Sequence, residues 1–253
     1  MPLPGILGRR KAKDNVLKKP IVIVATYGRS GSTLLGSLIS AGTGYHISGE
    51  NNDLLWGLFL SARALKTAQK RARRYRTGEN EPWHMIDKAN ARRYARRLLR
   101  IFFEEVVQPP ADAKGLGFKE IRFFDHPEMT QEYLQFIVDT LDNVSIVFNI
   151  RAHDEVAKSG WHKKQSPKIV KQRLETQEAQ MRTFLERNPD RAYLCDYNEY
   201  TANPDSLRGL FDFLRVPFAP DEIRKVLGTT LMHGKEGKPR KARAPRAGKR
   251  KQA

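Results

Sequence analysis

The chain has 253 residues, of which 40% are hydrophobic and 29% are charged, and its formal net charge is +18. This hydrophobic content is enough for one buried core of ordinary domain size and excludes a wholly disordered chain. No apolar run approaches the ~20 residues of a membrane-spanning helix. A single cysteine, Cys195, excludes an internal disulfide and a metal site built from cysteines. We therefore expect no membrane span, no metal, and a reducing, cytoplasmic setting.

The positive charge is concentrated in three segments. Residues 1–20 hold six Lys or Arg against one acid, residues 63–100 hold thirteen against three, and residues 235–253 hold nine against one. The remainder of the chain is mildly acidic. The net charge is therefore a property of these segments and not of the predicted core.

The first predicted element is a buried strand that runs into a glycine-rich loop and a helix. Residues 20–26 are a β-branched run with apolar side chains on both faces, which is typical of a parallel strand covered on both sides. The loop of residues 28–33 follows directly, and helical spacing follows the loop. A second short strand is predicted over 45–48, just before Glu50.

Two long helices are predicted next, over 53–76 and 84–107, and in the second the apolar residues and the arginines lie on different faces. The later predicted elements are strands at 115–123, 145–150 and 191–197, and helices at 128–141, 154–161, 168–187 and from Pro204 and Pro220 onward. Strands that alternate with helices indicate βαβ units. We therefore expect an α/β fold with a central parallel sheet covered on both sides.

The division of the chain follows from these patterns. We expect one domain over 20–234 with a helical insertion at about 53–108, a basic N-terminal segment over 1–19 and a basic disordered tail over 235–253. The tail has no apolar periodicity. It is either solvated or an arm that binds phosphates without sequence preference.

The loop after the first strand has the composition of an anion-binding site. Its residues are Gly28, Arg29, Ser30, Gly31, Ser32 and Thr33. A helix N-terminus that follows a parallel strand presents backbone N–H groups and a partial positive charge. The two glycines let the backbone approach a phosphate, the arginine adds a positive fork, and the hydroxyls add donors. The alternative is a tight turn of small residues.

A second phosphate site is predicted at the end of a later strand. Arg151 ends the strand of residues 145–150, and Ser159 lies eight residues further on, about two turns into the next helix. A charged fork and a hydroxyl placed in this way converge on one phosphate. Taken alone, Arg151 is better explained as a surface charge and Ser159 as a hydroxyl on a helix surface, so the combination with the first loop carries the prediction.

With these two elements, the sequence resembles the sulfotransferase superfamily, which uses 3′-phosphoadenosine 5′-phosphosulfate (PAPS). The resemblance rests on Tyr27-Gly-Arg-Ser-Gly-Ser-Thr-Leu-Leu35 as the 5′-phosphosulfate loop and on Arg151 with Ser159 as the 3′-phosphate element. It extends to Gly117-Phe-Lys-Glu-Ile-Arg122 and to the segment 197–217. It implies a P-loop-like three-layer α/β sandwich, and it is closest to the bacterial and carbohydrate-directed branches.

The resemblance implies an enzyme that transfers a sulfuryl group from PAPS to a hydroxyl or amine of a carbohydrate or glycoconjugate, without a metal. In those branches a glutamate follows the loop, as Glu50 does here. We hypothesise that Glu50 is the general base, because a hydroxyl is a weak nucleophile until its proton is accepted. Arg29 and Lys119 are then expected to stabilise the charge that develops during transfer. The alternatives are an acid that begins a helix for Glu50 and an exposed strand cation for Lys119.

The arginine-rich segment 63–100 falls where related enzymes build the acceptor side. We hypothesise that its arginine face borders the acceptor cleft and selects an anionic acceptor; the alternative is a solvated basic face. Two rival functions remain open. One is a non-catalytic, basic nucleic-acid-binding protein on a nucleotide-binding fold, and the other is an ATP-dependent kinase. The kinase is disfavoured because the loop lacks the lysine of G-x-x-x-x-G-K-[ST].

Overall fold

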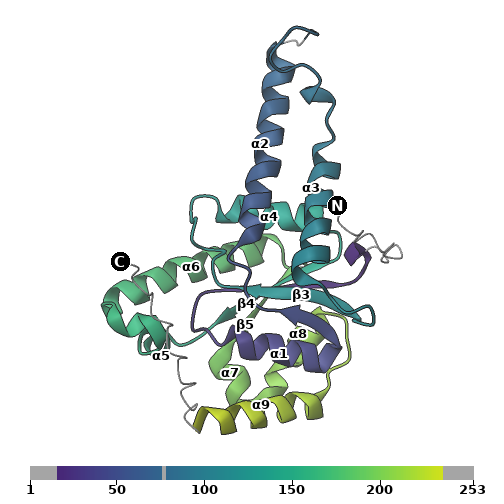
Figure 1. The fold of residues 1–253 in the computed structure, drawn as a ribbon. Helices are drawn as coiled ribbons and strands as arrows, with labels where there is room; N and C mark the ends of the chain where they lie inside the picture. The colour runs from purple at the N-terminus through teal and green to yellow at the C-terminus, as the bar shows by residue number, and fades with distance from the viewer. Residues whose placement is uncertain (1–15, 76–77, 236–253) are drawn as a thin grey trace, which may run out of the picture.

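Five parallel strands form one sheet in the order β2-β3-β1-β4-β5 (Figure 1). The computed structural model describes residues 16–75 and 78–235, so the predictions for 1–15 and 236–253 lie outside the described residues. The strands are β1 (Ile21–Thr26), β2 (Tyr45–Ser48), β3 (Gly115–Glu120), β4 (Val144–Ile150) and β5 (Ala192–Asp196). The predicted parallel α/β sheet is confirmed.

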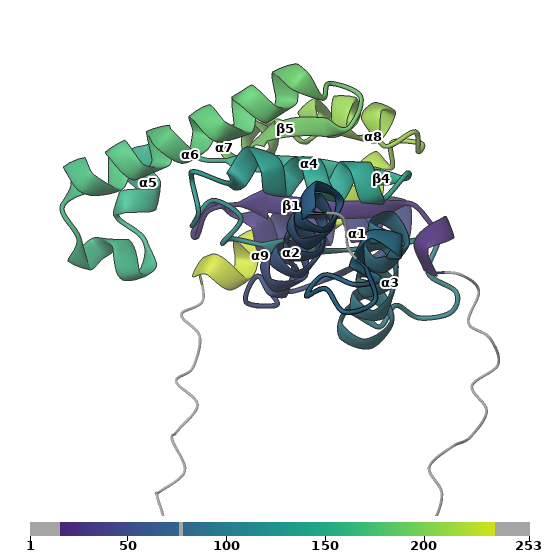
Figure 2. The same cartoon turned by 90° about the horizontal axis from the view of Figure 1, so that it is seen from above.

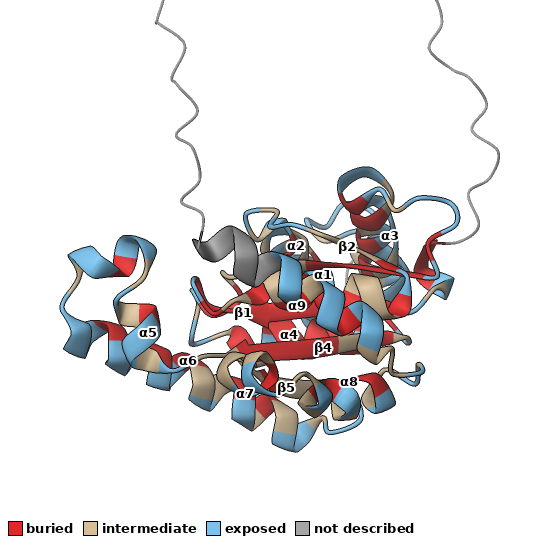
Figure 3. Ribbon diagram, turned by 90° about the horizontal axis from the view of Figure 1, so that it is seen from below, coloured by how far each residue is buried: buried red, intermediate tan, exposed pale blue. Residues whose placement is uncertain are grey.

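The side chains of the central strand β1 divide between two apolar layers. Ile21, Ile23 and Ala25 belong to one buried cluster, and Val22 and Val24 belong to the other. Successive side chains of a strand point to opposite faces, so each face of the sheet needs its own cover of helices. Figure 3 shows β1 and β4 buried along their length between helices whose outer sides are exposed.

Helices cover both faces. The first face carries α2 (Leu54–Tyr75), α3 (Ala91–Phe102), α4 (Thr130–Thr140), α5 (His153–Ala157) and α6 (Pro167–Arg187). The second face carries α1 (Ser32–Thr43), α7 (Tyr197–Ala202), α8 (Arg208–Phe213) and α9 (Pro220–Lys235). The result is the predicted three-layer sandwich. No helix in the described ranges is long and apolar enough to cross a membrane.

Helices α2 and α3 form a hairpin that projects away from the sheet in Figure 1 and is seen end-on in Figure 2. The Ser61 and Tyr94 hydroxyls join the two helices at 2.6 Å. The predicted start of the second helix at residue 84 is wrong. The side chain of Asn90 accepts a hydrogen bond from the Arg93 N–H at 2.8 Å, and this cap starts α3 at Ala91.

The sheet requires glycine at one position of β3. Gly117 of β3 lies against β1, and a Cβ atom there would approach the carbonyl oxygen of Val22 to 1.8 Å. Any larger residue would push the two strands apart. Because all five strands are parallel, their carboxyl ends meet at one edge of the sheet, which is where ligands bind in open α/β sheets.

Candidate active site

The loop between β1 and α1 is held in a conformation that suits glycine. Gly31 has a φ angle of 89°, and a Cβ atom there would approach the ring of Tyr197 to 2.1 Å. Gly31 is also the N-cap of α1 and supplies no side-chain cap. The first-turn N–H groups of α1 are therefore presented to a ligand. The loop is tied to β4, because Asn149 Nδ2 donates to the Ser30 carbonyl oxygen at 2.9 Å.

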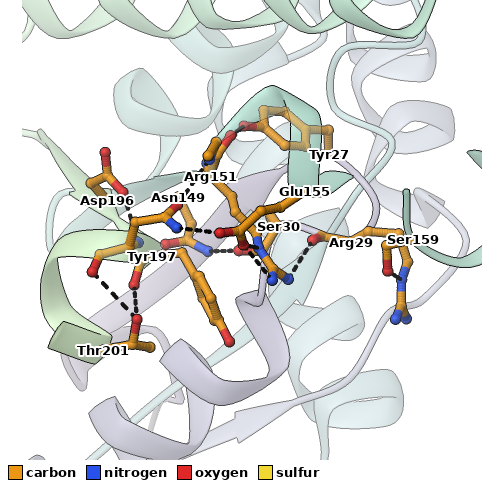
Figure 4. A network of polar contacts seen from close by, with 12 residues as sticks. Tyr27, Arg29, Ser30, Asn149, Arg151, Glu155, Ser159, Asp196, Tyr197 and Thr201 are labelled. Atoms are coloured by element: carbon orange, nitrogen blue, oxygen red, sulfur yellow. Dashed lines mark hydrogen bonds and ion pairs between the residues drawn. The ribbon is translucent and has the colours of Figure 1, made fainter. Parts of the chain in front are cut away.

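Arg151 follows β4 and is fixed by several contacts (Figure 4). Its backbone N–H donates to the Tyr27 hydroxyl at 2.8 Å, and its Nη2 lies 2.6 Å from Glu155 Oε2. Its guanidinium carbon lies 4.1 Å from the centre of the Tyr197 ring. Nη1 also donates to the Arg29 carbonyl oxygen at 3.4 Å. Arg151 is thereby held against the loop in one orientation.

Burial raises the pKa of Tyr27 well above its usual value, and the nearby Glu178 raises it further. The phenol therefore stays protonated. It donates to Glu178 Oε1 at 2.8 Å while it accepts from the Arg151 N–H. Tyr27 thus holds the backbone of Arg151 in position.

Ser159 does not lie on a helix, so that prediction is wrong. Helix α5 ends at Ala157, and Gly160, with a φ angle of 57°, begins a 3-10 turn over Gly160–Lys164. A residue in the left-handed region interrupts a right-handed helix. The serine nevertheless reaches the loop, because Arg29 Nε donates to Ser159 Oγ at 2.9 Å (Figure 4). This bond joins the two predicted phosphate elements.

Glu50 and Lys119 form an ion pair at the same edge of the sheet. Glu50 follows β2, Lys119 lies in β3, and the two strands are neighbours. Arg122 Nη1 lies 3.7 Å from the second oxygen of Glu50. The side chain of Lys119 is 14% exposed, so it is not an exposed strand cation. Glu50 does not cap α2, because the Leu54 N–H donates to the side chain of Asn51 instead.

Glu120 is a functional candidate that the sequence reasoning missed. It is fully buried, and its carboxylate accepts the backbone N–H groups of Asn51 at 3.1 Å, Asp53 at 2.9 Å and Ile121 at 2.8 Å. These bonds fix the segment that follows Glu50. The sequence signal was available: Glu120 stands on the same face of the predicted strand as the apolar residues Leu116 and Phe118.

One cavity of about 400 Å³, here called the loop cavity, brings most of the predicted residues together. It is lined by Gly28, Arg29, Gly31, Ser32, Thr33, Glu50, Lys119 and Arg151, together with Leu34, Ser37, Ile121, Trp161 and Tyr197. Two predicted residues do not line it. Ser30 is buried, with no hydrogen-bond partner for its hydroxyl in the described part of the chain, and Ser159 acts on Arg29 from outside. The size is typical of a small-molecule site.

A second cavity of about 250 Å³, here called the side cavity, adjoins the first. Gly28, Ile121 and Trp161 line both cavities. The other residues that line the side cavity are Tyr27, Arg122, Asp125, His162, Arg173, Leu174 and Gln177. The buried oxygen of the Gln177 amide has no hydrogen-bond partner among the described residues. An unpaired buried acceptor is costly, so a donor group on a ligand would satisfy it.

The ionisation of the side cavity is shaped by burial. Burial raises the pKa of Asp125, although the neighbouring Arg122 opposes this shift. Burial lowers the pKa of His162, which favours the neutral ring. Arg173 Nη2 lies 3.1 Å from Nδ1 of that ring, where a neutral imidazole can accept a hydrogen bond.

The arginine face of α3, which is part of the segment 63–100, does not border either cavity, so the structure does not bring these arginines to the predicted site residues. Its arginines lie beside Leu17 and Asp142, which precede β1 and β4. The site residues follow the strands, whereas these two residues precede them. The arginines are therefore at the amino edge of the sheet. Within the described ranges, no cluster of three His, Cys, Asp or Glu side chains is placed to hold a metal ion.

No model of a known protein family matches the chain, and no curated protein matches it. Solved structures do match. The sulfotransferase domain of the olefin synthase from Synechococcus PCC 7002 is 16% identical, with a TM-score of 0.53 over 81% of this chain and 75% of that one. The sulfotransferase domain from the curacin biosynthetic pathway is 17% identical, with a TM-score of 0.48 over 81% and 76%. Sulfotransferase STF9 from Mycobacterium avium is 11% identical, with a TM-score of 0.43 over 86% and 68%.

The first of these similarities establishes the fold of this chain as that of a sulfotransferase domain. The P-loop-like sandwich expected from the sequence resemblance is thus confirmed at the level of fold. Function is a separate question, because one fold supports many activities and the chemistry depends on the site.

Proposed function

We propose that the chain is a PAPS-dependent sulfotransferase that transfers a sulfuryl group to a hydroxyl or amine of a carbohydrate or glycoconjugate. One observation carries the proposal. Arg29 and Arg151, from two different strand ends, line a single cavity with Glu50 and Lys119. That arrangement offers two anion-binding groups, a further cation and a carboxylate to a sulfuryl donor and its acceptor.

The loop cavity fits a nucleotide with two phosphate groups. Its donors are two guanidinium groups, the first-turn N–H groups of α1 and several hydroxyls, and its one acid, Glu50, is already paired with Lys119. Arg29 and the helix N-terminus would hold the 5′-phosphosulfate. Arg151 would hold the 3′-phosphate, with Ser159 orienting Arg29 between the two groups.

Charge governs the mechanism at this site. Bound PAPS supplies the activated sulfuryl group and leaves as 3′,5′-ADP. Sulfuryl transfer resembles phosphoryl transfer, which is an in-line displacement through a loose transition state. The protein therefore mainly positions the two reactants and neutralises the charge that develops between them. Arg29 and the first turn of α1 neutralise the charge that grows on the departing phosphate. Lys119 approaches the same point from β3.

Glu50 is the proton acceptor in this mechanism. As the acceptor oxygen bonds to sulfur, its proton passes to the carboxylate of Glu50. Lys119 and Arg122 hold the two oxygens of that carboxylate, and Glu120 fixes the segment that follows it. The base is therefore positioned before the acceptor binds.

The side cavity is the proposed acceptor site, since it shares Gly28, Ile121 and Trp161 with the loop cavity. Its polar groups and the exposed indole of Trp161 suit a polyol. The unpartnered amide oxygen of Gln177 requires a donor, which a sugar hydroxyl provides. These features support a carbohydrate acceptor over an apolar one.

Ligand-induced thermal stabilisation tests the nucleotide part of the proposal. At about one hundred times the dissociation constant, 3′,5′-ADP should raise the melting temperature by roughly 5–10 °C. Arg151→Met should reduce this rise, whereas Arg182→Met, at an exposed arginine of α6, should not. An equal rise with ATP would favour a kinase instead.

Transfer of radiolabelled sulfate from PAPS to a panel of saccharides tests the acceptor part. Transfer should require Glu50 and should be reduced by Gln177→Leu, which keeps a side chain of similar size but offers no acceptor atom. Transfer only to planar apolar alcohols would contradict a carbohydrate acceptor while leaving the transferase intact.

A further inference from the structure

The proposed function does not use the five arginines of α3 that line a cavity of their own. A cavity of about 410 Å³ lies along α3, beside Leu17 and Asp142, and we call it the arginine groove. It is lined by Arg92, Arg93, Arg96, Arg97 and Arg100, with Leu17, Asn90 and Asp142. Five of its eight residues therefore carry a guanidinium group, and one carries an acid.

The arginine groove is separate from the transfer site. Leu17 precedes β1 and Asp142 precedes β4, whereas the loop cavity follows those strands. A strand of six residues such as β1 spans about 20 Å. A ligand in the groove therefore occupies the opposite edge of the sheet from the nucleotide.

The groove is only partly neutralised by the protein. Asp142 lies 3.6 Å from Arg92 and 2.9 Å from Arg96, so one acid serves two guanidinium groups. Glu104 lies 3.5 Å from Arg100. Arg93 and Arg97 are exposed and have no acidic partner in the described part of the chain. Among the described residues, two guanidinium forks therefore remain for an external anion.

The spacing of these arginines indicates an extended anion. Arginines four positions apart on one helix lie about 6 Å apart along its axis, which is comparable with neighbouring phosphates on one nucleic-acid strand. Guanidinium groups bind phosphate through paired N–H donors. The sequence preceding Leu17 and the sequence beyond residue 235 are also basic, so further charge lies along the same chain.

We propose that the arginine groove binds the phosphate backbone of a single nucleic-acid strand, independently of sequence. Arg93 and Arg97 each contact a phosphate, and Asp142 keeps Arg92 and Arg96 in register beside them. This binding does not rest on the transferase proposal, because the groove shares no residue with the loop cavity or the side cavity.

Fluorescence anisotropy with a labelled oligothymidylate and the full chain tests the proposal. The double variant Arg93→Gln/Arg97→Gln should weaken binding roughly 25-fold at 0.1 M salt and should reduce the salt slope by about 1.4, as expected for two lost contacts to a single strand. The control Arg182→Gln/Arg187→Gln removes the same charge from exposed positions of α6. It should leave the slope unchanged. Arg93→Lys/Arg97→Lys should retain most of the affinity.

Two further measurements make the test decisive. Saturating 3′,5′-ADP should not displace the oligonucleotide, since the two ligands lie at opposite edges of the sheet. Equal losses of oligonucleotide affinity in the groove variant and the control variant would show that only net charge matters, and would overturn the proposal. So would displacement by 3′,5′-ADP, tighter binding of heparin than of an oligonucleotide of equal charge, or no binding of the wild-type chain. Circular dichroism checks that the variants fold.

Discussion

Arginines at the two edges of the sheet are held in different ways. At the carboxyl edge, Arg29 is bonded to Ser159, and Arg151 is bonded to Glu155 and stacked on Tyr197. At the amino edge, the exposed side chains of α3 include arginines without an acidic partner in the described chain. A guanidinium group held in one orientation suits a ligand of defined shape, such as a nucleotide. A guanidinium group that is not held suits an anion with repeated charges, such as a nucleic-acid strand. The same residue type thus supports two kinds of recognition in one molecule.

The largest expected effect lies at the carboxyl edge. Glu50→Gln keeps the shape of the side chain but removes the proton acceptor, so kcat should fall by about 10²–10⁴. The thermal shift with 3′,5′-ADP should be unchanged, since the loop donors remain. Glu186→Gln, at an exposed acid of α6, is the matched control. Steady-state transfer assays decide the matter, and full activity in Glu50→Gln would remove Glu50 from the mechanism.

Arg151 sharpens the comparison between fixed and unfixed arginines. Loss of a hydrogen bond to a charged group costs about 1.5–3 kcal/mol, so Arg151→Met should weaken 3′,5′-ADP roughly 10- to 100-fold. Arg151→Lys should recover only part of this, because an ammonium lacks the planar fork. Arg93→Met should not alter nucleotide affinity. Isothermal titration calorimetry with the three variants measures the affinity for 3′,5′-ADP. A larger loss of affinity in Arg93→Met than in Arg151→Met would contradict the role of Arg151.

Glu120 should act on the site without touching a ligand. Glu120→Gln replaces an oxygen that accepts backbone N–H groups with a donor, and a buried unsatisfied group costs about 1–3 kcal/mol. The unfolding free energy should fall by that amount, and kcat should fall more than nucleotide affinity. Glu132→Gln, which loses only an exposed ion pair with Arg63, is the control. Equal losses of kcat and nucleotide affinity would indicate general damage instead of a positioning role.

The strands and the anion-binding loop could be predicted from the sequence because their signals are local. A β-branched run followed by Gly28–Thr33 specifies a strand, a turn and a helix N-terminus, and the structure has all three. The resemblance led us to expect Glu50 and Lys119 at one site, and the structure shows that Glu50 follows β2 and Lys119 lies in the neighbouring strand β3. Because the strands are parallel, the residues at their carboxyl ends meet at one edge of the sheet.

The rest depended on contacts between distant residues. Ser159 was predicted on a helix, but Gly160 has a positive φ angle and lies so close to Arg29 that a Cβ atom there would approach the arginine side chain to 2.9 Å. The position of the α3 arginines at the amino edge depends on how the hairpin packs beside Leu17 and Asp142. The hypothesis for these arginines rested on where related enzymes build the acceptor side, and no local signal in this chain specifies the edge of the sheet at which they lie.

Asp53 lies between the two regions, at the start of the hairpin and next to the buried Glu120. Burial raises the pKa of Asp53 from 3.8 to about 6, although the Tyr133 hydroxyl donates to it at 2.7 Å. Between about pH 4 and pH 6, the folded chain therefore binds a proton that the unfolded chain has lost. The contribution of this group to the unfolding free energy falls as the pH rises through that window and is constant above it.

Asp53→Asn removes this titration while keeping an oxygen for Tyr133. The variant should gain stability relative to the wild type as the pH rises from about 4 to 6. The full shift corresponds to roughly 3 kcal/mol, and partial exposure of the carboxyl reduces the expected gain to about 1 kcal/mol. Urea unfolding of both proteins across this range measures the difference, with the exposed Asp139→Asn as the control. A wild type that gains on the variant with rising pH would show that Asp53 is stabilised as the anion, and the segment joining the site to the hairpin would then be held by charge attraction.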